Sequence, residues 1–156
     1  MSLNLKFNYS YSSDELAQFF VDNVSPKYIS HSELQGYRAI DKHTWNKDLL
    51  ETIKLEFLNA NHVITALVGK ILVGIGIISI NKDALIPYAT VEDIIIKKEY
   101  QGRNIGSELL SEIEAYATEQ GCKRLFLESG VTNIEAHQFF FKNGFNLCSF
   151  VMAKSI

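Results

Sequence analysis

The 156-residue sequence has only two cysteines and two prolines, and it lacks both a long apolar run and a basic cluster. Cys122 and Cys148 stand in no Cys-x-x-Cys or Cys/His spacing, so we expect both to be reduced and structural. The four histidines also show no metal-ligand spacing, and we predict no metal site. The longest apolar run, 71–80, is far shorter than the roughly 18–20 residues of a membrane span. Because the N-terminus lacks a basic stretch followed by an apolar core, we expect a cytoplasmic protein without a signal peptide.

The charge balance argues against nucleic acid and membrane partners. The net charge is −3, and the cationic pairs Lys97-Lys98 and Lys123-Arg124 are isolated. This slight acidity suits a cationic small substrate. With 47% hydrophobic residues, the chain should form one domain, 1–156, that buries roughly two-thirds of its unfolded surface.

Hydrophobic periodicity predicts a mixed α/β domain with the order β-α-α-β-β-β-α-β-α-β. Alternating residues predict a strand over 3–9, and the segment Pro26–Ile40 has no clear period, so we interpret it as a loop or short helical turn. We expect helices over about 13–23, 42–59, 105–120 and 132–143. Strands are expected over 62–67, 71–80, 88–97, 123–128 and 145–153.

The most informative segment is 91–107, where an apolar strand leads through a short Gly/Asn loop directly into a helix. A helix start of this kind directs free backbone N–H groups and the positive end of the helix dipole at one point. That geometry suits a di- or polyphosphate. The spacing Gln101-x-x-Asn104-x-Gly106-Ser107 matches neither the dinucleotide fingerprint nor the P-loop. Asn104 can adopt the positive φ that such a loop requires.

Three blocks resemble the GNAT N-acetyltransferase superfamily. They are the strand 91–96, the loop 101–107, and the segment 133–145 with its Asn…Ala…Phe-Phe-x-Lys-x-Gly-Phe pattern. The resemblance implies a single-domain GNAT acyl-CoA N-acyltransferase fold with acetyl-CoA as the acyl donor. It also implies transfer to the primary amine of a small molecule by direct attack in a ternary complex. Two alternatives stay open: an acyl-CoA-binding or sensor module with weak or no catalysis, and a protein or peptide N-acetyltransferase.

The resemblance further implies that strand 88–97 separates from strand 123–128 at a bulge. The pantetheine arm of acetyl-CoA would complete the opened edge, and the loop amides would hold the pyrophosphate. The cofactor-binding residues implied in this way are Ile94, Ile95, Ile96, Gln101, Gly102, Arg103, Asn104, Ile105, Gly106, Ser107, Asn133 and Phe140.

Acetyl transfer requires a neutral amine. At pH 7 an aliphatic amine is neutral only one time in ~2,500, so its deprotonation costs roughly 4–5 kcal/mol. We predict Glu92 as the proton acceptor and Asp93 as the alternative catalytic residue. Because neighbouring side chains of a strand point to opposite faces, only one of them should line the cleft. Many family members protonate the leaving thiolate with a tyrosine where this chain has Phe140. Whether this lowers activity, and which group supplies the proton, stay open.

The acceptor site is less well marked in the sequence. By resemblance, an aromatic wall for the substrate would come from the segment before residue 60 and from the strand before the loop, from Tyr28, Tyr37, Trp45 and Tyr88. The identity of the amine stays open, and so does the oligomeric state, although many relatives form homodimers through their last strands.

Overall fold

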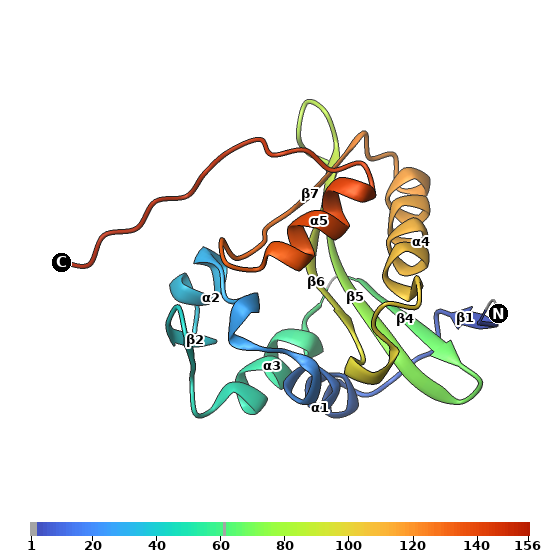
Figure 1. Cartoon of the computed structure of the whole chain (residues 1–156). Coiled ribbons are helices and arrows are strands. Elements are labelled where there is room, and N and C mark those ends of the chain that lie inside the picture. Colours follow the sequence, from blue (N-terminus) through green and yellow to red (C-terminus); the bar gives the residue numbers. More distant parts are fainter. Residues whose placement is uncertain (1–2, 61) are drawn as a thin grey trace.

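The protein is described by a computed structural model that covers residues 3–60 and 62–156, and its centre is a twisted five-stranded sheet (Figure 1). The strand order is β1-β4-β5-β6-β7, with the first four antiparallel and β7 parallel to β6. The mixed α/β architecture predicted from the sequence is therefore confirmed. The strands are β1 (Leu5–Phe7), β4 (His62–Val68), β5 (Ile71–Asn81), β6 (Tyr88–Ile96) and β7 (Arg124–Leu127).

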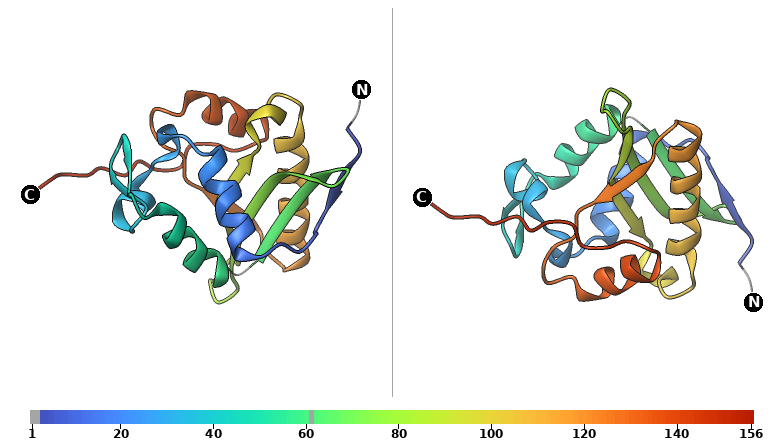
Figure 2. Two further views of the ribbon diagram at one scale, coloured as in Figure 1. Left: turned by 90° about the horizontal axis from the view of Figure 1, so that it is seen from below. Right: turned by 90° about the horizontal axis from the view of Figure 1, so that it is seen from above.

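Helices cover both faces of this sheet (Figure 2). Helices α1 (Ser13–Asn23) and α3 (Leu49–Leu58) pack on one apolar cluster, which includes Ile75 and Ile95 of the sheet. Helices α4 (Ile105–Glu119) and α5 (Ile134–Lys142) contribute to a second cluster. Gly76 lets α4 approach β5 closely, because a Cβ at this position would lie 2.7 Å from Cδ1 of Ile113.

The segment between α1 and α3 forms small elements, and one predicted boundary is wrong here. It contains η1 (Pro26–Tyr28), α2 (His31–Gln35), and a two-stranded hairpin of β2 (Ala39–Asp41) and β3 (Thr44–Trp45). The helix expected from about residue 42 begins only at Leu49. The turn at Asp41, whose carboxylate accepts the His43 amide at 2.8 Å, instead directs the chain into β3.

The strand predicted over 145–153 is also wrong, since no helix or strand follows α5 in this structure. Gly144, with φ +90°, ends the helix, and the rest of the chain runs away from the body in extended form (Figure 1). A strand requires a neighbour for its backbone groups, and this segment finds none within its own chain.

The remaining connections are short. A 3-10 turn, η2 (Lys98–Tyr100), joins β6 to α4. Across residues 3–60 and 62–156, no helix is both long and apolar enough to cross a bilayer. Over the same ranges, no three His, Cys, Asp or Glu residues gather as a metal site would require. Both cysteines are free, with Cys122 buried and Cys148 exposed.

Candidate active site

Strand β6 parts from β7 halfway along its length, as predicted. The two strands pair only over residues 88–91 and 124–127, while β6 continues to Ile96. The Lys97 amide donates to the Val73 carbonyl of β5 at 2.8 Å. Because backbone groups alternate sides along a strand, Ile94 and Ile96 direct theirs to the open edge. The backbone groups of Ile95, like those of Lys97, point toward β5, and its side chain is buried in the core, so Ile95 offers no free group to that edge.

The loop that follows has the backbone expected of an anion-binding turn. Asn104 adopts φ +65°, the left-handed conformation predicted for it, and Gly102 adopts φ +75°. The Glu108 amide is the first to bond back within the helix, to Asn104 at 3.2 Å. The amides of Ile105, Gly106 and Ser107 therefore have no intrahelical partner. Open strand and loop together fit an extended, amide-bearing chain that ends in a diphosphate.

Other loop residues support this shape. The Gln101 side-chain amide donates to the Ile96 carbonyl at 3.1 Å and so ties the loop to the strand end. The Arg103 guanidinium lies 5.1 Å from the centre of the Tyr100 ring. A Cβ at Gly106 would meet the Phe139 ring at 3.0 Å. This glycine therefore allows α5 to pack against the start of α4.

A cleft of about 260 Å³ lies beside the open part of β6 and continues to α5 and the η1–β2 segment. Ile94 belongs to its wall, so the cleft adjoins the open strand edge. Its charge is strongly negative, because among the described residues that line it, one guanidinium, Arg38, faces five carboxylates. These carboxylates belong to Glu33, Glu56, Glu92, Asp93 and Glu128.

Both candidate acids of β6 line this cleft, so the expectation that only one of them would do so is wrong. The register places Ile77 opposite Asp93 and Ile78 opposite Val91, which leaves Glu92 as the extra residue of a β-bulge. A bulge breaks the strict alternation of side chains and redirects them. The Glu92 carboxylate is exposed and accepts the Ser79 hydroxyl at 2.5 Å.

Asp93 is instead buried, only 2% exposed, and fully bonded. The Arg38 guanidinium contacts its carboxylate through two nitrogens, at 2.8 and 3.0 Å, and the Tyr28 hydroxyl donates to it at 2.6 Å. Arg38 also pairs with Glu56 of α3. Asp93 thus joins the bulge of β6 to the segment over the cleft.

The balance of burial and charge in this network raises the pKa of two of its members, Tyr28 and Arg38. Burial, followed by the Asp93 charge and hydrogen bond, raises the pKa of the Tyr28 hydroxyl well above its ordinary value. Burial alone would lower the pKa of Arg38, but bonds to Asp93 and Glu56 outweigh it and leave that pKa raised. Tyr28 therefore keeps its proton and Arg38 its charge.

Helix α5 supplies the rest of the cleft wall. Asn133 caps the helix, its side-chain oxygen accepting the Ala136 amide at 3.4 Å, and it lines the cleft. Phe140 is buried and also lines the cleft. Its ring carries no hydroxyl group that could donate a proton there. His137 contacts the Gly130 carbonyl at 2.8 Å and holds the turn before the helix.

The four predicted substrate aromatics do not form one wall. Tyr28 alone among them lines the cleft. Trp45 packs against Phe20 and Tyr28 in the core, with its indole N–H buried and without a partner in the described residues. Tyr37 is 81% exposed, and Tyr88 lies at the far end of β6 against Phe126.

Sequence reasoning missed Arg38, Glu33, Glu56 and Glu128. An acid inside an apolar strand signals that a buried counter-charge is needed, but it does not say which of the 15 lysines and arginines supplies it. Arg38 lies in the one segment without periodicity, and no local pattern marks it.

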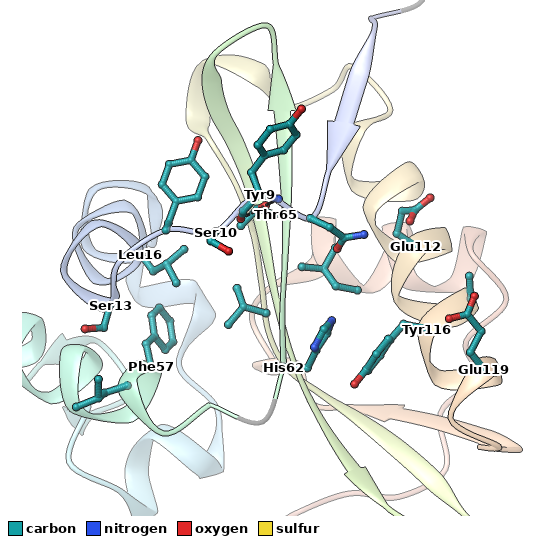
Figure 3. Close-up of a pocket in the computed structure, with 16 residues that line it drawn as sticks. Tyr9, Ser10, Ser13, Leu16, Phe57, His62, Thr65, Glu112, Tyr116 and Glu119 are labelled. Atoms are coloured by element: carbon teal, nitrogen blue, oxygen red, sulfur yellow. Dashed lines mark hydrogen bonds between the residues drawn. The ribbon is translucent and has the colours of Figure 1, made fainter.

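A larger cavity, about 610 Å³, lies elsewhere, between the N-terminal segment, β4 and α4 (Figure 3). His62 stacks on Tyr116 there, with ring centres 3.8 Å apart, beside Glu112 and Glu119. Burial lowers the pKa of His62. No residue of β6 or of the loop 101–107 lines this cavity, so the smaller cleft is the candidate active site.

The profile described as the acetyltransferase (GNAT) family matches residues 27–145. No curated protein matches the sequence. A transcriptional regulator from Bacillus halodurans C-125 is 17% identical over 99% of both chains, with a TM-score of 0.69. Aminoglycoside N-acetyltransferase AAC(6')-Iy in complex with CoA is 14% identical over 99% of this chain and 94% of that one, with a TM-score of 0.66. Glucosamine-6-phosphate N-acetyltransferase from Arabidopsis thaliana is 16% identical over 97% and 98%, with a TM-score of 0.62.

Identities of this size show a shared fold and nothing finer, but the family profile spans most of the sequence. The open strand and the anion-binding turn lie within the matched residues. The chain belongs to the GNAT family of acetyltransferases, whose acyl donor is acetyl-CoA.

Proposed function

We propose that this chain transfers the acetyl group of acetyl-CoA to the primary amine of a small, multiply charged cation. The observation that supports this most is the acidic cleft beside the open edge of β6. Five carboxylates facing one guanidinium attract and orient cationic amines, and this favourable field extends to the donor site at Ile94.

Glu92 is the proposed proton acceptor. It is exposed, lies at the bulge, and adjoins the open edge where the reacting groups would meet. Asp93 is a poor alternative, because the Arg38 guanidinium and the Tyr28 hydroxyl already occupy its oxygens. We assign Asp93 to positioning the bulge, and with it Glu92.

The donor would be held mainly by backbone groups. Acetyl-CoA would lie along Ile94 and Ile96, its diphosphate at the amides of the loop 101–107, and the Ile94 amide would stabilise the oxyanion of the attacked thioester. Asn133 would contact the pantetheine or acetyl end. Phe140 offers no proton to the thiolate, but a thiol of pKa about 8.5 is an acceptable leaving group without one.

A small acceptor fits this cleft better than a protein. The segment from η1 to β2 contributes Ser30, Glu33 and Arg38 to the wall and narrows the cleft to about 260 Å³. Several proteins of the same fold are aminoglycoside acetyltransferases by name, which agrees with a cationic acceptor.

The test is release of free thiol from acetyl-CoA across a panel of polyamines, aminoglycosides, amino sugars, amino acids and a lysine peptide. We expect the highest kcat/KM with polycations and a steep fall as salt screens the cleft. Glu56→Gln should raise KM for these acceptors, whereas Glu114→Gln, on the exposed face of α4, should not. Calorimetric binding of acetyl-CoA without thiol release for any acceptor would instead support a binding module.

A further inference from the structure

The proposed acetyl transfer makes no use of the cavity of about 610 Å³ between the N-terminal segment, β4 and α4 (Figure 3). We call it the β4 cavity. Its volume lies within the range of small-molecule sites, roughly 300–1,000 Å³. It is larger than the cleft beside β6, and the two have no lining residue in common. A ligand in the β4 cavity would therefore occupy a site separate from that of the acetyl acceptor.

The cavity exists because β1 covers only part of β4. Strand β4 pairs with β5 along all of His62–Val68, whereas β1 reaches only as far as Ala66. Asn8 then adopts φ +64°, a left-handed conformation that ends the pairing and turns the chain away. Two hydrogen bonds between the Tyr9 backbone and the Thr65 hydroxyl, at 2.9 and 2.7 Å, hold the chain in this course. The outer edge of β4 before Thr65 is left without a strand beside it in the described sheet, and the cavity lies against this edge.

The wall on the α4 side is aromatic and acidic. His62 and Tyr116 stack there with ring centres 3.8 Å apart and an angle of 7° between their planes. Glu112 and Glu119 lie four residues before and three residues after Tyr116, so α4 presents all three on one face. Neither carboxylate forms an ion pair with any residue of the described ranges 3–60 and 62–156. Because burial lowers the pKa of His62, its ring is neutral at pH 7 and does not offset this negative charge.

The opposite wall is largely apolar and belongs to α1 and α3. Leu16 and Phe57 line it, with Ser13 at the start of α1. Figure 3 shows these three residues on one side of β4, and the stack of His62 and Tyr116 with both carboxylates on the other. No lysine or arginine stands among the described residues that line the cavity. The β4 cavity thus combines an apolar half with an aromatic half that carries uncompensated negative charge.

We propose that the β4 cavity binds an amphipathic organic amine, which has an apolar or aromatic body and one ammonium group. The body would lie against Leu16 and Phe57, and the ammonium group would lie at the α4 wall, in the field of Glu112 and Glu119. A protonated amine is attracted by these carboxylates and by the tyrosine rings that line the cavity. An anion of the same shape would meet two like charges, and a polyol would gain nothing from the apolar half. The site is independent of the proposed acetyl transfer.

Histidine signals in a proton NMR spectrum can report on this cavity and on the active-site cleft at once. His62 lies in the β4 cavity, whereas the Nδ1 atom of His31 is 3.2 Å from the carboxylate of Glu128, which lines the cleft. The two sets of ring signals are assigned with His62→Gln and His31→Gln. The probe is phenethylamine, which joins a phenyl ring to one ammonium group. We expect the His62 signals of the wild type to shift and to saturate by about 10 mM probe, as for a weak small-molecule site.

Matched ligands and variants identify what holds the probe. The anion 3-phenylpropanoate keeps the ring but reverses the charge, and n-butylamine keeps the charge without the ring, so each should bind at least fivefold more weakly. Glu112→Gln with Glu119→Gln should also weaken phenethylamine binding at least fivefold. Glu108→Gln with Glu114→Gln removes the same charge from exposed positions of α4 outside the cavity and should leave the affinity unchanged.

Three results would overturn the proposal. The first is the absence of a saturable shift at His62 by about 10 mM phenethylamine. The second is a shift confined to His31, which would place the probe in the active-site cleft. The third is equal affinity of the wild type and of Glu112→Gln with Glu119→Gln. Because no acetyl-CoA is present in these titrations, their outcome is separate from the thiol-release test of the proposed function.

Discussion

Removing the Arg38 guanidinium tests whether the Asp93 network positions the bulge. Arg38→Met keeps the length of the side chain but leaves the Asp93 carboxylate buried without its bidentate partner. Breaking a buried pair in this way costs about 3–5 kcal/mol. Because the Tyr28 hydroxyl would still donate to Asp93, we expect a loss near the lower end, about 3 kcal/mol.

The assay is urea unfolding monitored by the fluorescence of Trp45, the single tryptophan, which packs against Tyr28. In a chain of this size, a loss of about 3 kcal/mol should also lower the Tm by roughly 6–12 °C. Arg38→Lys keeps the charge without the fork geometry and should fall between wild type and Arg38→Met. Glu56→Gln is the control on the exposed side of the same guanidinium, and it should cost less than about 1 kcal/mol.

The energetic coupling between Arg38 and Asp93 tests whether the pair anchors the bulge. If they form one unit, Arg38→Met combined with Asp93→Asn should cost much less than the sum of the single changes. A loss below about 1 kcal/mol for Arg38→Met, or additive costs in the double variant, would refute the anchoring role. Asp93 would then be free to act as a base.

Three further predictions follow from the site. Glu92→Gln should lower kcat roughly 10²–10⁴-fold with little change in acetyl-CoA affinity, whereas Phe140→Tyr should be neutral or mildly activating, both measured by thiol release. Ser107→Glu should weaken calorimetric binding of acetyl-CoA at least tenfold by placing a carboxylate at the loop amides, and Ser111→Glu, one turn later, should not. Since the pKa of Tyr28 is raised, its contribution to stability is complete below pH about 10 and is lost as pH rises further. The stability of Tyr28→Phe, measured as the urea midpoint, should therefore fall less steeply than that of the wild type as pH rises above about 10. An unchanged dependence on pH would contradict the buried hydrogen bond between Tyr28 and Asp93.

Local signals in the sequence predicted the donor side of the site well. Positive φ at Asn104 and the free amides at the start of α4 follow from residue types and short spacings, whereas the parting of β6 from β7 was implied only by the resemblance to the family. These features are local, because a turn and a helix start are determined within a few residues.

The acceptor side depends on long-range contacts, and there the sequence pointed to only part of the cleft wall, Tyr28, Glu92 and Asp93. The Arg38–Asp93 pair joins residues 55 positions apart, and it was invisible in a segment without periodicity. The hairpin of β2 and β3 replaced the start of the helix expected from about residue 42, because one side chain, Asp41, capped the turn. Neither the ion pair nor the capped turn changes the hydrophobic periodicity of the sequence.

The failed strand at 145–153 shows a different limit of periodicity. Its residues have the strand propensity that the prediction used, yet propensity reports only how well a residue suits a pleated surface. Whether a strand forms depends on a neighbour that offers free backbone groups, and the segment after α5 meets none within its own chain.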